Sequence, residues 1–421
     1  MSKEPLIFLF LISFIFSTFS SIAEEIKVEI DHHFISKTVY YHCEKIINNE
    51  GGKLKNSGWV EISRKSNSLT FSNNKKKTKL LINLQKNSNN NIRGLKFTFY
   101  DEKEQPSLLV LLNIQCKVKI SRLIIRSNDN LIVAIANLSE DLLNIEKIEK
   151  INPKVPDFSP PNGIEIALID TGVNYTLKTI SPHLSRLNKN TLSGYDFYDN
   201  DDLPFDVDFT RSPFFPMHHG TAVASVIVKE APNASIVIYR FPRNNMCKFE
   251  DLVKHVSERK IKIANLAMGS KNLKDWECFE KSVRLNKNIL FFVSAGNDGK
   301  NIDLEKIYPA SFNLDNILVV TSSDIFGKLA KGSNYGEKSV DFMIPGEQIP
   351  VIDHRGVRTK ASGSSYAVPR LTAMAARYLS LNPHASISEI KKVLISRTIS
   401  TSDKFVKYGW IPDPTDNYLL D

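Results

Sequence analysis

Hydrophobic and polar residues follow two different patterns along this chain of 421 residues, and the change between them falls near residue 155. Between residues 24 and about 155, apolar and polar side chains alternate, most clearly from Leu95 to Tyr100. A period of two is typical of a half-buried β-strand. Further strand-like runs cover 107–120 and 123–135, and the polar stretches predicted as exposed loops are 73–77 and 86–91. This region is therefore predicted to be rich in β-strands.

From residue 164 onward, short and wholly apolar runs alternate with segments of helical periodicity. The predicted strands are 164–169, 236–239, 261–267, 289–294 and 317–321. The predicted helices are 219–228, 251–260, 275–286, 365–380 and 388–396, the last opened by a capping box of Ser386 and Glu389. This alternation predicts an α/β fold with a mostly parallel sheet and helices on both of its faces. Such sheets bind ligands at the carboxyl ends of their strands, where candidate chemistry is expected.

The boundary between the two patterns is rich in proline. Prolines 153, 156, 160 and 161 mark the stretch 152–163 as a linker. We therefore predict a smaller β-rich domain over residues 24–156, followed by the α/β domain over residues 157–421.

Residues 1–23 have the features of an export signal. Lys3 precedes an apolar run over 6–16, and the small residues up to Ala23 suit a cleavage site. The run is too short to span a bilayer comfortably, although an uncleaved anchor is the alternative because Glu4 offsets the charge of Lys3. We predict cleavage after Ala23, a secreted or periplasmic protein, and no membrane span afterwards.

The chain has four cysteines, two in each part. An even number in an exported chain permits disulfides, and the simplest pairing is Cys43–Cys116 with Cys247–Cys278. Four buried free thiols are the alternative. Three histidines near Cys43 (His32, His33 and His42) follow no metal-ligand spacing and are interpreted as ordinary surface or strand positions.

Composition excludes several classes of protein. Hydrophobic residues make up 42% and charged residues 24%, which excludes a disordered chain and a coiled coil. The net charge of +9 permits nucleic acid or anionic surfaces as partners. The charges are scattered and no nucleic-acid-binding motif is present, so no nucleic-acid partner is predicted.

Four short motifs place reactive groups at the expected edge of the sheet. Asp170 ends the first strand, His219-Gly220-Thr221 opens a helix, Asn297 follows another buried strand, and Ser365 begins a helix whose first turn also holds Pro369. Each motif alone is weak, because Asp170 can simply end a strand, Asn297 can be a turn residue and Ser365 can be an N-cap.

Together the motifs resemble those of the subtilisin-like serine proteases, the subtilases, over residues 157–400. They occur in that family's order, and the segments 265–269, 308–310 and 341–346 match it as well. The resemblance implies a triad of Ser365 as nucleophile, His219 as general base and Asp170 orienting the base, with Asn297 in the oxyanion hole. It implies no cofactor for the chemistry.

The resemblance also implies a specificity pocket. Its two walls would be Ala267-Met268-Gly269 and Ser294-Ala295-Gly296, with Ile307 near its floor. An isoleucine there predicts a preference for a small residue before the scissile bond, unless Ile307 turns into the core. Several positions depart from the family pattern, and they affect the expected substrate preference more than the activity: Ser364, Tyr366, Ala267, Arg370 and Ala373.

Three carboxylates, Asp196, Asp199 and Asp201, resemble a calcium-binding loop of the family. Leu203 and Phe205 stand where that loop often has polar residues, so an acidic surface loop is the alternative.

The sequence thus predicts an exported serine endopeptidase that acts on protein or peptide substrates. Its own N-terminal region is either a propeptide that inhibits it and is removed by a cut near 145–160, or a permanent accessory domain. A catalytically silent binding protein on the same fold is the alternative function. A lipase or esterase is disfavoured because the order Asp170, His219, Ser365 differs from that of the α/β-hydrolases.

Overall fold

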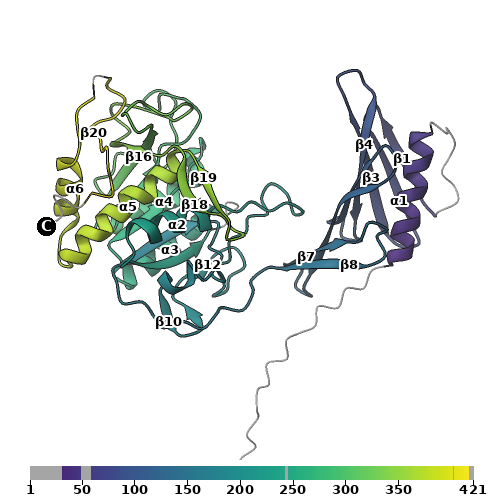
Figure 1. Ribbon diagram of the computed structural model, residues 1–421, viewed down its shortest axis with the longest axis horizontal. Helices are drawn as coiled ribbons and strands as arrows, with labels where there is room; N and C mark the ends of the chain where they lie inside the picture. The colour runs from purple at the N-terminus through teal and green to yellow at the C-terminus, as the bar shows by residue number, and fades with distance from the viewer. Residues whose placement is uncertain (1–30, 49–57, 242–244, 402, 417–421) are drawn as a thin grey trace, which may run out of the picture.

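A computed structural model describes residues 31–48, 58–241, 245–401 and 403–416. The predicted export signal, residues 1–23, lies outside the described residues. The described chain forms two lobes, an N-terminal β-lobe and a larger α/β lobe (Figure 1). Among the described residues, no helix has the length and apolarity needed to cross a bilayer.

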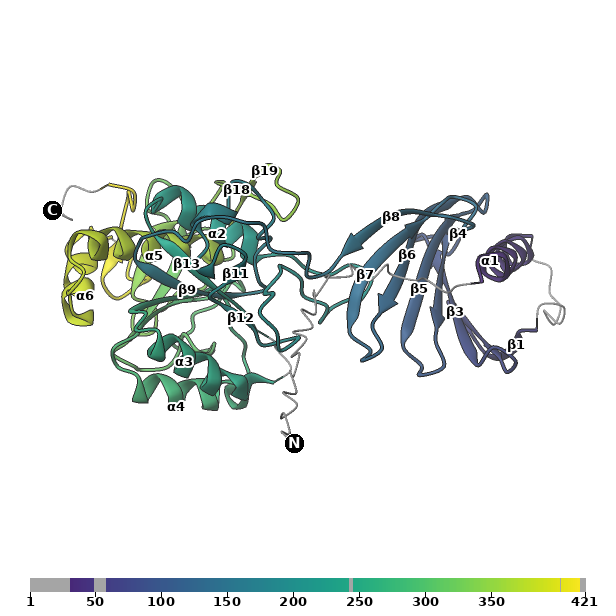
Figure 2. The same cartoon turned by 90° about the horizontal axis from the view of Figure 1, so that it is seen from below.

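The β-lobe is one antiparallel sheet whose eight strands are neighbours in chain order (Figure 2). Its strands are β1 (Val60–Lys65), β2 (Ser68–Asn73), β3 (Thr78–Lys86), β4 (Ile92–Tyr100), β5 (Pro106–Asn113), β6 (Val118–Arg126), β7 (Ile132–Leu138) and β8 (Ile145–Lys150). Helix α1 (His32–Ile47) packs against one face of the sheet. Alternate strand residues such as Phe97 and Val110 point to this face and are fully buried.

Part of the region predicted as β-rich is a helix. The stretch 32–47 is a helix, because Asp31 caps its first turn through Phe34 N and its apolar positions Ile35, Val39 and Cys43 recur every four residues. The histidine preceding Cys43 is accordingly buried on that helix rather than on the surface or in a strand.

The run 107–120 is not continuous either. Asn113 Oδ1 accepts hydrogen bonds from the backbone N–H groups of Gln115 and Lys117, which closes a tight turn between β5 and β6. A second turn, at 127–131, divides the run 123–135 between β6 and β7.

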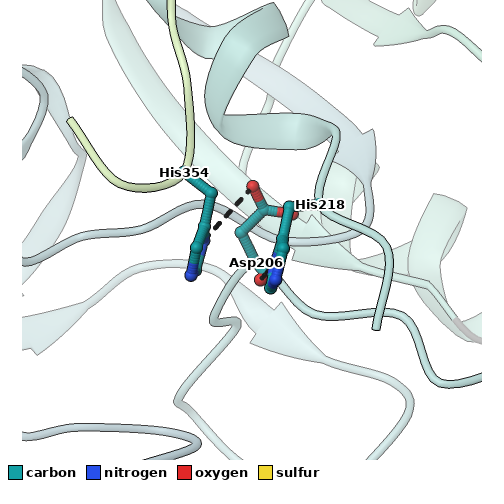
Figure 3. A group of neighbouring side chains, drawn as sticks. All are labelled: Asp206, His218 and His354. Atoms are coloured by element: carbon teal, nitrogen blue, oxygen red, sulfur yellow. Dashed lines mark hydrogen bonds and ion pairs between the residues drawn. The ribbon is translucent and has the colours of Figure 1, made fainter. Parts of the chain in front are cut away.

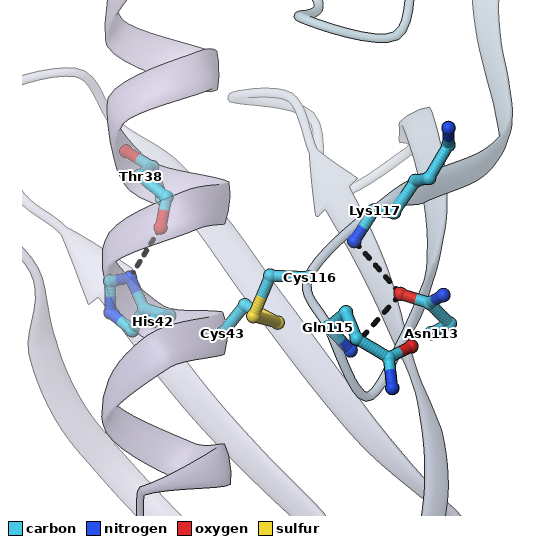
Figure 4. The surroundings of a disulfide bond; sticks show 7 residues. All are labelled: Thr38, His42, Cys43, Asn113, Gln115, Cys116 and Lys117. Carbon is cyan, nitrogen blue, oxygen red and sulfur yellow. Dashed lines mark hydrogen bonds between the residues drawn. A yellow bond between two sulfur atoms is a disulfide. The ribbon is translucent and has the colours of Figure 1, made fainter.

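Both predicted disulfides are confirmed. Cys43–Cys116 joins α1 to the turn between β5 and β6, so it fixes the helix on the sheet (Figure 4). Cys247–Cys278 joins the segment before α3 to the first turn of α4.

The α/β lobe is built on the predicted parallel sheet, in the order β12-β13-β9-β14-β15-β16-β17-β20. Its strands are β9 (Glu165–Asp170), β12 (Tyr195–Asp196), β13 (Ser235–Arg240), β14 (Ile263–Leu266), β15 (Leu290–Ser294), β16 (Ile317–Ser323), β17 (Phe342–Pro345) and β20 (Gly409–Trp410). Two short antiparallel pairs complete the strands: β10 (Arg186–Asn188) with β11 (Thr191–Leu192), and β18 (Ile349–Ile352) with β19 (Arg358–Ala361).

Helices cover both faces of this sheet, as predicted. On one face lie α2 (Gly220–Glu230), α5 (Ser364–Leu381) and α6 (Ile387–Ser396), and the capping box of Ser386 and Glu389 is confirmed. On the other lie α3 (Phe249–Glu258) and α4 (Glu277–Leu285). The carboxyl ends of β9, β14 and β15 meet at one edge, where the candidate site lies.

The proline-rich segment has no helix or strand, yet it is fixed to the α/β lobe. Val155 is buried in the core of that lobe, and the carbonyl oxygens of Pro153 and Pro156 accept hydrogen bonds from Tyr175 and Arg186.

The lobes also touch away from the linker. Phe214, in the excursion 208–217 before α2, is buried against Leu109, Ile124 and Ile135 on the sheet face opposite α1. Its carbonyl oxygen accepts a hydrogen bond of 3.1 Å from Arg122 Nε. The β-lobe therefore has one face for its own helix and another for the α/β lobe.

Candidate active site

A carboxylate and an imidazole meet at the edge of the parallel sheet. Asp170 ends β9 and is buried, and His219 stands directly before α2. His219 Nδ1 lies 2.8 and 2.9 Å from the two carboxylate oxygens of Asp170. Because a carboxylate only accepts, Nδ1 is the donor, and the lone pair of a neutral imidazole is left on Nε2.

Glycine allows this close approach. A Cβ on Gly220 would lie 2.0 Å from the carbonyl oxygen of Gly172 and 3.1 Å from Asp170 Cβ. Any side chain at position 220 would therefore push α2, and with it His219, away from the end of β9.

Asp206 caps helix α2 from outside the helix. His219 is the N-cap residue of α2 but makes no capping bond with its side chain, which faces Asp170. Instead, Asp206 Oδ1 accepts from His219 N (3.1 Å) and Asp206 Oδ2 from Thr221 N (3.0 Å). Thr171 Oγ1 accepts from Gly220 N (2.9 Å) and donates to Asp206 Oδ1 (2.6 Å). The first N–H groups of the helix are thus satisfied by Asp206 and Thr171, and the imidazole of His219 is not needed as a cap.

The negative charge of Asp206 also suits its place at the N-terminus of α2. Burial alone would raise the pKa of Asp206, but the neighbouring imidazoles of His354 and His218 and the Thr171 hydroxyl outweigh burial and hold that pKa below its usual range. An ionised carboxylate at a helix N-terminus is also favoured by the helix dipole. Asp206 cannot be recognised from the sequence, since a single Asp between two apolar residues, 13 positions before His219, forms no motif.

Ser365 lies between two residues that contact the other members of the site. Ser364 donates from its backbone N to Asn297 Oδ1 at 2.9 Å, and the ring of Tyr366 lies 5.8 Å from that of His219. Gly363 is the N-cap of α5, so Ser365 is not an N-cap. The expectation that Pro369 stands in the first turn was wrong, because α5 begins at Ser364 and Pro369 falls in the second turn.

Asn297 has a fixed orientation. The Ser364 N–H group requires an acceptor, so the oxygen of the Asn297 amide faces α5 and its Nδ2 points elsewhere. Gly363, at φ +129°, makes room for this: a Cβ there would lie 3.2 Å from Asn297 Oδ1.

The predicted pocket walls follow two neighbouring strands. Ala267–Gly269 continues β14, and Ser294–Gly296 continues β15. Ile307 is buried, and its Cγ2 lies 3.4 Å from the position that a Cβ on Gly269 would take. The side chain of Ile307 therefore lies against the wall that contains Gly269.

The predicted calcium loop holds an arginine. Arg240 Nη1 donates to Asp196 Oδ2 and Asp199 Oδ2, both at 2.7 Å. The amide of Asn152 donates to Asp199 and Asp201 at 3.4 and 3.3 Å. Because these oxygens already have donors, a calcium ion would have to displace Arg240. Calcium remains a prediction from the sequence that this geometry does not favour.

One group of potential metal ligands occurs among the described residues: Asp206, His218 and His354 (Figure 3). It fits a metal poorly. The carboxylate of Asp206 caps α2, and the two imidazoles are stacked 3.6 Å apart with 12° between their planes. The lone pairs of parallel rings do not converge on one point, as metal ligands must. We therefore assign no metal to this group.

The fold and the site together define an α/β protein with a carboxylate–imidazole pair at the carboxyl edge of its parallel sheet. Residues 161–410 match the sequence pattern of the subtilase family. The chain belongs to the subtilase family, and the resemblance and the fold class inferred from its motifs are confirmed.

Curated relatives match only part of their own length. The chain is 30% identical over 272 residues to "Thermophilic serine proteinase" of Bacillus sp. (strain AK1), covering 59% of this chain and 60% of that protein. It is 26% identical over 247 residues to "Cell wall-associated protease" of Bacillus subtilis (strain 168), covering 55% and 25%.

Solved structures share the fold. A lanthipeptide protease superposes with a TM-score of 0.51 at 18% identity, covering 61% of this chain and 86% of that one. A chain of the subtilase cytotoxin SubAB superposes with a TM-score of 0.52 at 20% identity, covering 63% and 91%.

Proposed function

We propose that this protein is a serine endopeptidase, with Ser365 as nucleophile, His219 as general base, Asp170 as the residue that orients the base, and Asn297 in the oxyanion hole. The observation that carries the proposal is the bond from His219 Nδ1 to Asp170 in a member of the subtilase family. That bond fixes the tautomer and leaves Nε2 able to take the proton of a serine hydroxyl.

Acyl transfer then takes two displacements. Ser365 Oγ bonds to the carbonyl carbon of the scissile peptide while its proton passes to His219 Nε2. The carbon–nitrogen bond breaks as the imidazolium returns this proton to the leaving amine, and an acyl-enzyme remains. Water, deprotonated by the same imidazole, releases the acid and restores the serine.

Asp170 and Asn297 lower the barrier in different ways. The buried carboxylate of Asp170 stabilises the imidazolium that forms during each step. Since Asn297 Oδ1 is held by Ser364 N, the Nδ2 donor is already oriented when negative charge develops on the substrate oxygen.

The proposal also covers the specificity of the enzyme for the residue before the scissile bond. Ile307 would fill the space for a large residue before the scissile bond, so small residues such as alanine are preferred there.

Two disulfides suit an oxidising compartment, which agrees with cleavage after Ala23 and a secreted or periplasmic location.

A fluorophosphonate probe tests the central assignment. It should label Ser365, as read by mass spectrometry, and Ser365→Ala should abolish both labelling and peptidase turnover. The matched control is Ser380→Ala at the far end of α5, where the hydroxyl bonds only within the helix. Activity should also rise from acidic to neutral pH, because only the neutral imidazole can act as the general base. A folded, unlabelled wild-type protein without turnover would favour the silent binding protein instead.

A further inference from the structure

A cavity of about 720 Å³ lies between the two lobes. The β-lobe contributes Arg122, Lys147, Glu149 and Lys150, and the α/β lobe contributes, among others, His218 and Tyr366. This volume is within the range that holds peptides and other small ligands.

The cavity lies beside the proposed catalytic residues but is not lined by Asp170, His219 or Ser365 themselves. It is lined by Tyr366 and His218, the neighbours in sequence of Ser365 and His219. The walls of the specificity pocket, 267–269 and 294–296, do not line it. In the proposed reaction the acyl part of the substrate occupies that pocket. A site for the chain beyond the scissile bond must be separate from that pocket, as this cavity is.

The acidic residues of the cavity wall already have partners, whereas one lysine has none in the part of the chain that the structure describes. Glu149 is paired with Arg122 (3.0 Å) and Lys147 (3.3 Å), and Asp353 is paired with Arg355 (2.6 Å). Asp206 is occupied by its bonds to α2. Lys150, at the end of the edge strand β8, has no acidic partner within 4 Å among the described residues.

The β-lobe is held in place to form this wall. Phe214 is buried against the sheet, and Arg122 bonds to the Phe214 carbonyl as well as to Glu149. These contacts are made by residues outside the linker, so a cut in the linker would not remove them.

We propose that the cavity binds the leaving-group side of the polypeptide substrate, that the β-lobe supplies one wall of the active enzyme, and that Lys150 selects an acidic residue there. The proposal rests on the proposed peptidase function. It gives the N-terminal region a part in substrate selection instead of a place across the cleft as an inhibitor.

The test uses quenched fluorescent peptides with one acyl side, ending in alanine before the scissile bond. Their leaving-group sides differ only in Glu or Gln at each of the first three positions. At one or more positions the Glu peptide should show a kcat/KM about two- to fivefold higher, as for a partly exposed charge pair. This ratio should fall to about one in Lys150→Ala and persist in Lys119→Ala, an exposed lysine of β6 that does not line the cavity.

The ratio separates this proposal from the proposed function. Equal cleavage of the Glu and Gln peptides at every position by the wild type would overturn the role of the cavity while leaving the peptidase intact. An unchanged ratio in Lys150→Ala would overturn the role of the β-lobe. A failure of the peptidase proposal would show instead as absent labelling by the fluorophosphonate probe.

Discussion

Removing the carboxylate of Asp206 should cost both stability and catalysis. It accepts four hydrogen bonds: from His219 N (3.1 Å), Thr171 Oγ1 (2.6 Å), Thr221 N (3.0 Å) and Thr221 Oγ1 (2.5 Å). In Asp206→Ala the two hydroxyls can rotate toward other acceptors, but the two backbone N–H groups cannot. Each buried unsatisfied donor costs roughly 1–3 kcal/mol, so we expect a loss of about 3–5 kcal/mol in the free energy of unfolding.

Asp206→Asn isolates the charge. The amide keeps the shape of the side chain and one accepting oxygen, so one backbone N–H group is satisfied and the other faces an NH₂ group. The expected loss is about 1–3 kcal/mol, measured by urea unfolding at pH 7. Because His219 N is one of the two groups, kcat should fall.

A lower pH should reduce the difference in unfolding free energy between wild type and Asp206→Asn. The pKa of Asp206 is depressed in the folded state, so its stabilisation is complete above the unfolded value near 4 and is lost as pH falls through the folded pKa. The gap in unfolding free energy between wild type and Asp206→Asn should therefore stay constant from pH 7 to about pH 5 and shrink as the pH falls below about 4. The control is Asp324→Asn, whose carboxylate caps only an exposed turn. Equal unfolding midpoints and equal kcat for wild type and Asp206→Asn would refute the capping argument.

Three further predictions concern other parts of the α/β lobe. Ile307→Gly should raise kcat/KM for Phe before the scissile bond roughly tenfold relative to Ala, and a wild type that already prefers Phe would contradict this. Burial raises the pKa of Asp341 to about 6, so the native state holds the proton more tightly and stability falls as pH rises from about 4 to 6, by about 3 kcal/mol. Asp341→Asn, which can still accept from Val319 N, should abolish that fall in urea titrations; an unchanged slope would exclude Asp341 as its source. EDTA should leave the Tm unchanged, whereas Arg240→Ala should cost about 3–5 kcal/mol by leaving buried carboxylates unpaired, and a Tm lowered by EDTA would restore the calcium loop.

The sequence predicted the α/β lobe more fully than the β-lobe, for physical reasons. Strands such as 317–321 are buried on both faces, so their wholly apolar runs stand out between polar helices. In the β-lobe, the turn after β5 depends on the side chain of Asn113 inside an otherwise apolar run, which hides the break. Helix α1 has charged and polar residues on its exposed side, and its four-residue period is carried by few apolar positions.

The same contrast holds within the site. Asp170 and His219 each lie in a short motif that can be recognised in the sequence, and the fold brings the two side chains within hydrogen-bonding distance. Asp206 reaches Thr171 across 35 positions of the chain, and its role exists only once β9 and α2 have met. Such a residue is found from packing, because its own surroundings in the sequence are ordinary.

The attachment of the proline-rich segment to the α/β lobe decides where that lobe can be expressed by itself. Composition suggests a start at residue 157, but Val155 fills part of the core and the Pro153 carbonyl bonds to the buried Tyr175. A truncated chain that begins at residue 157 would lose an apolar side chain and leave a buried hydroxyl without its acceptor. One that begins at residue 152 would keep both, so the useful cloning boundary lies several residues upstream of the apparent one.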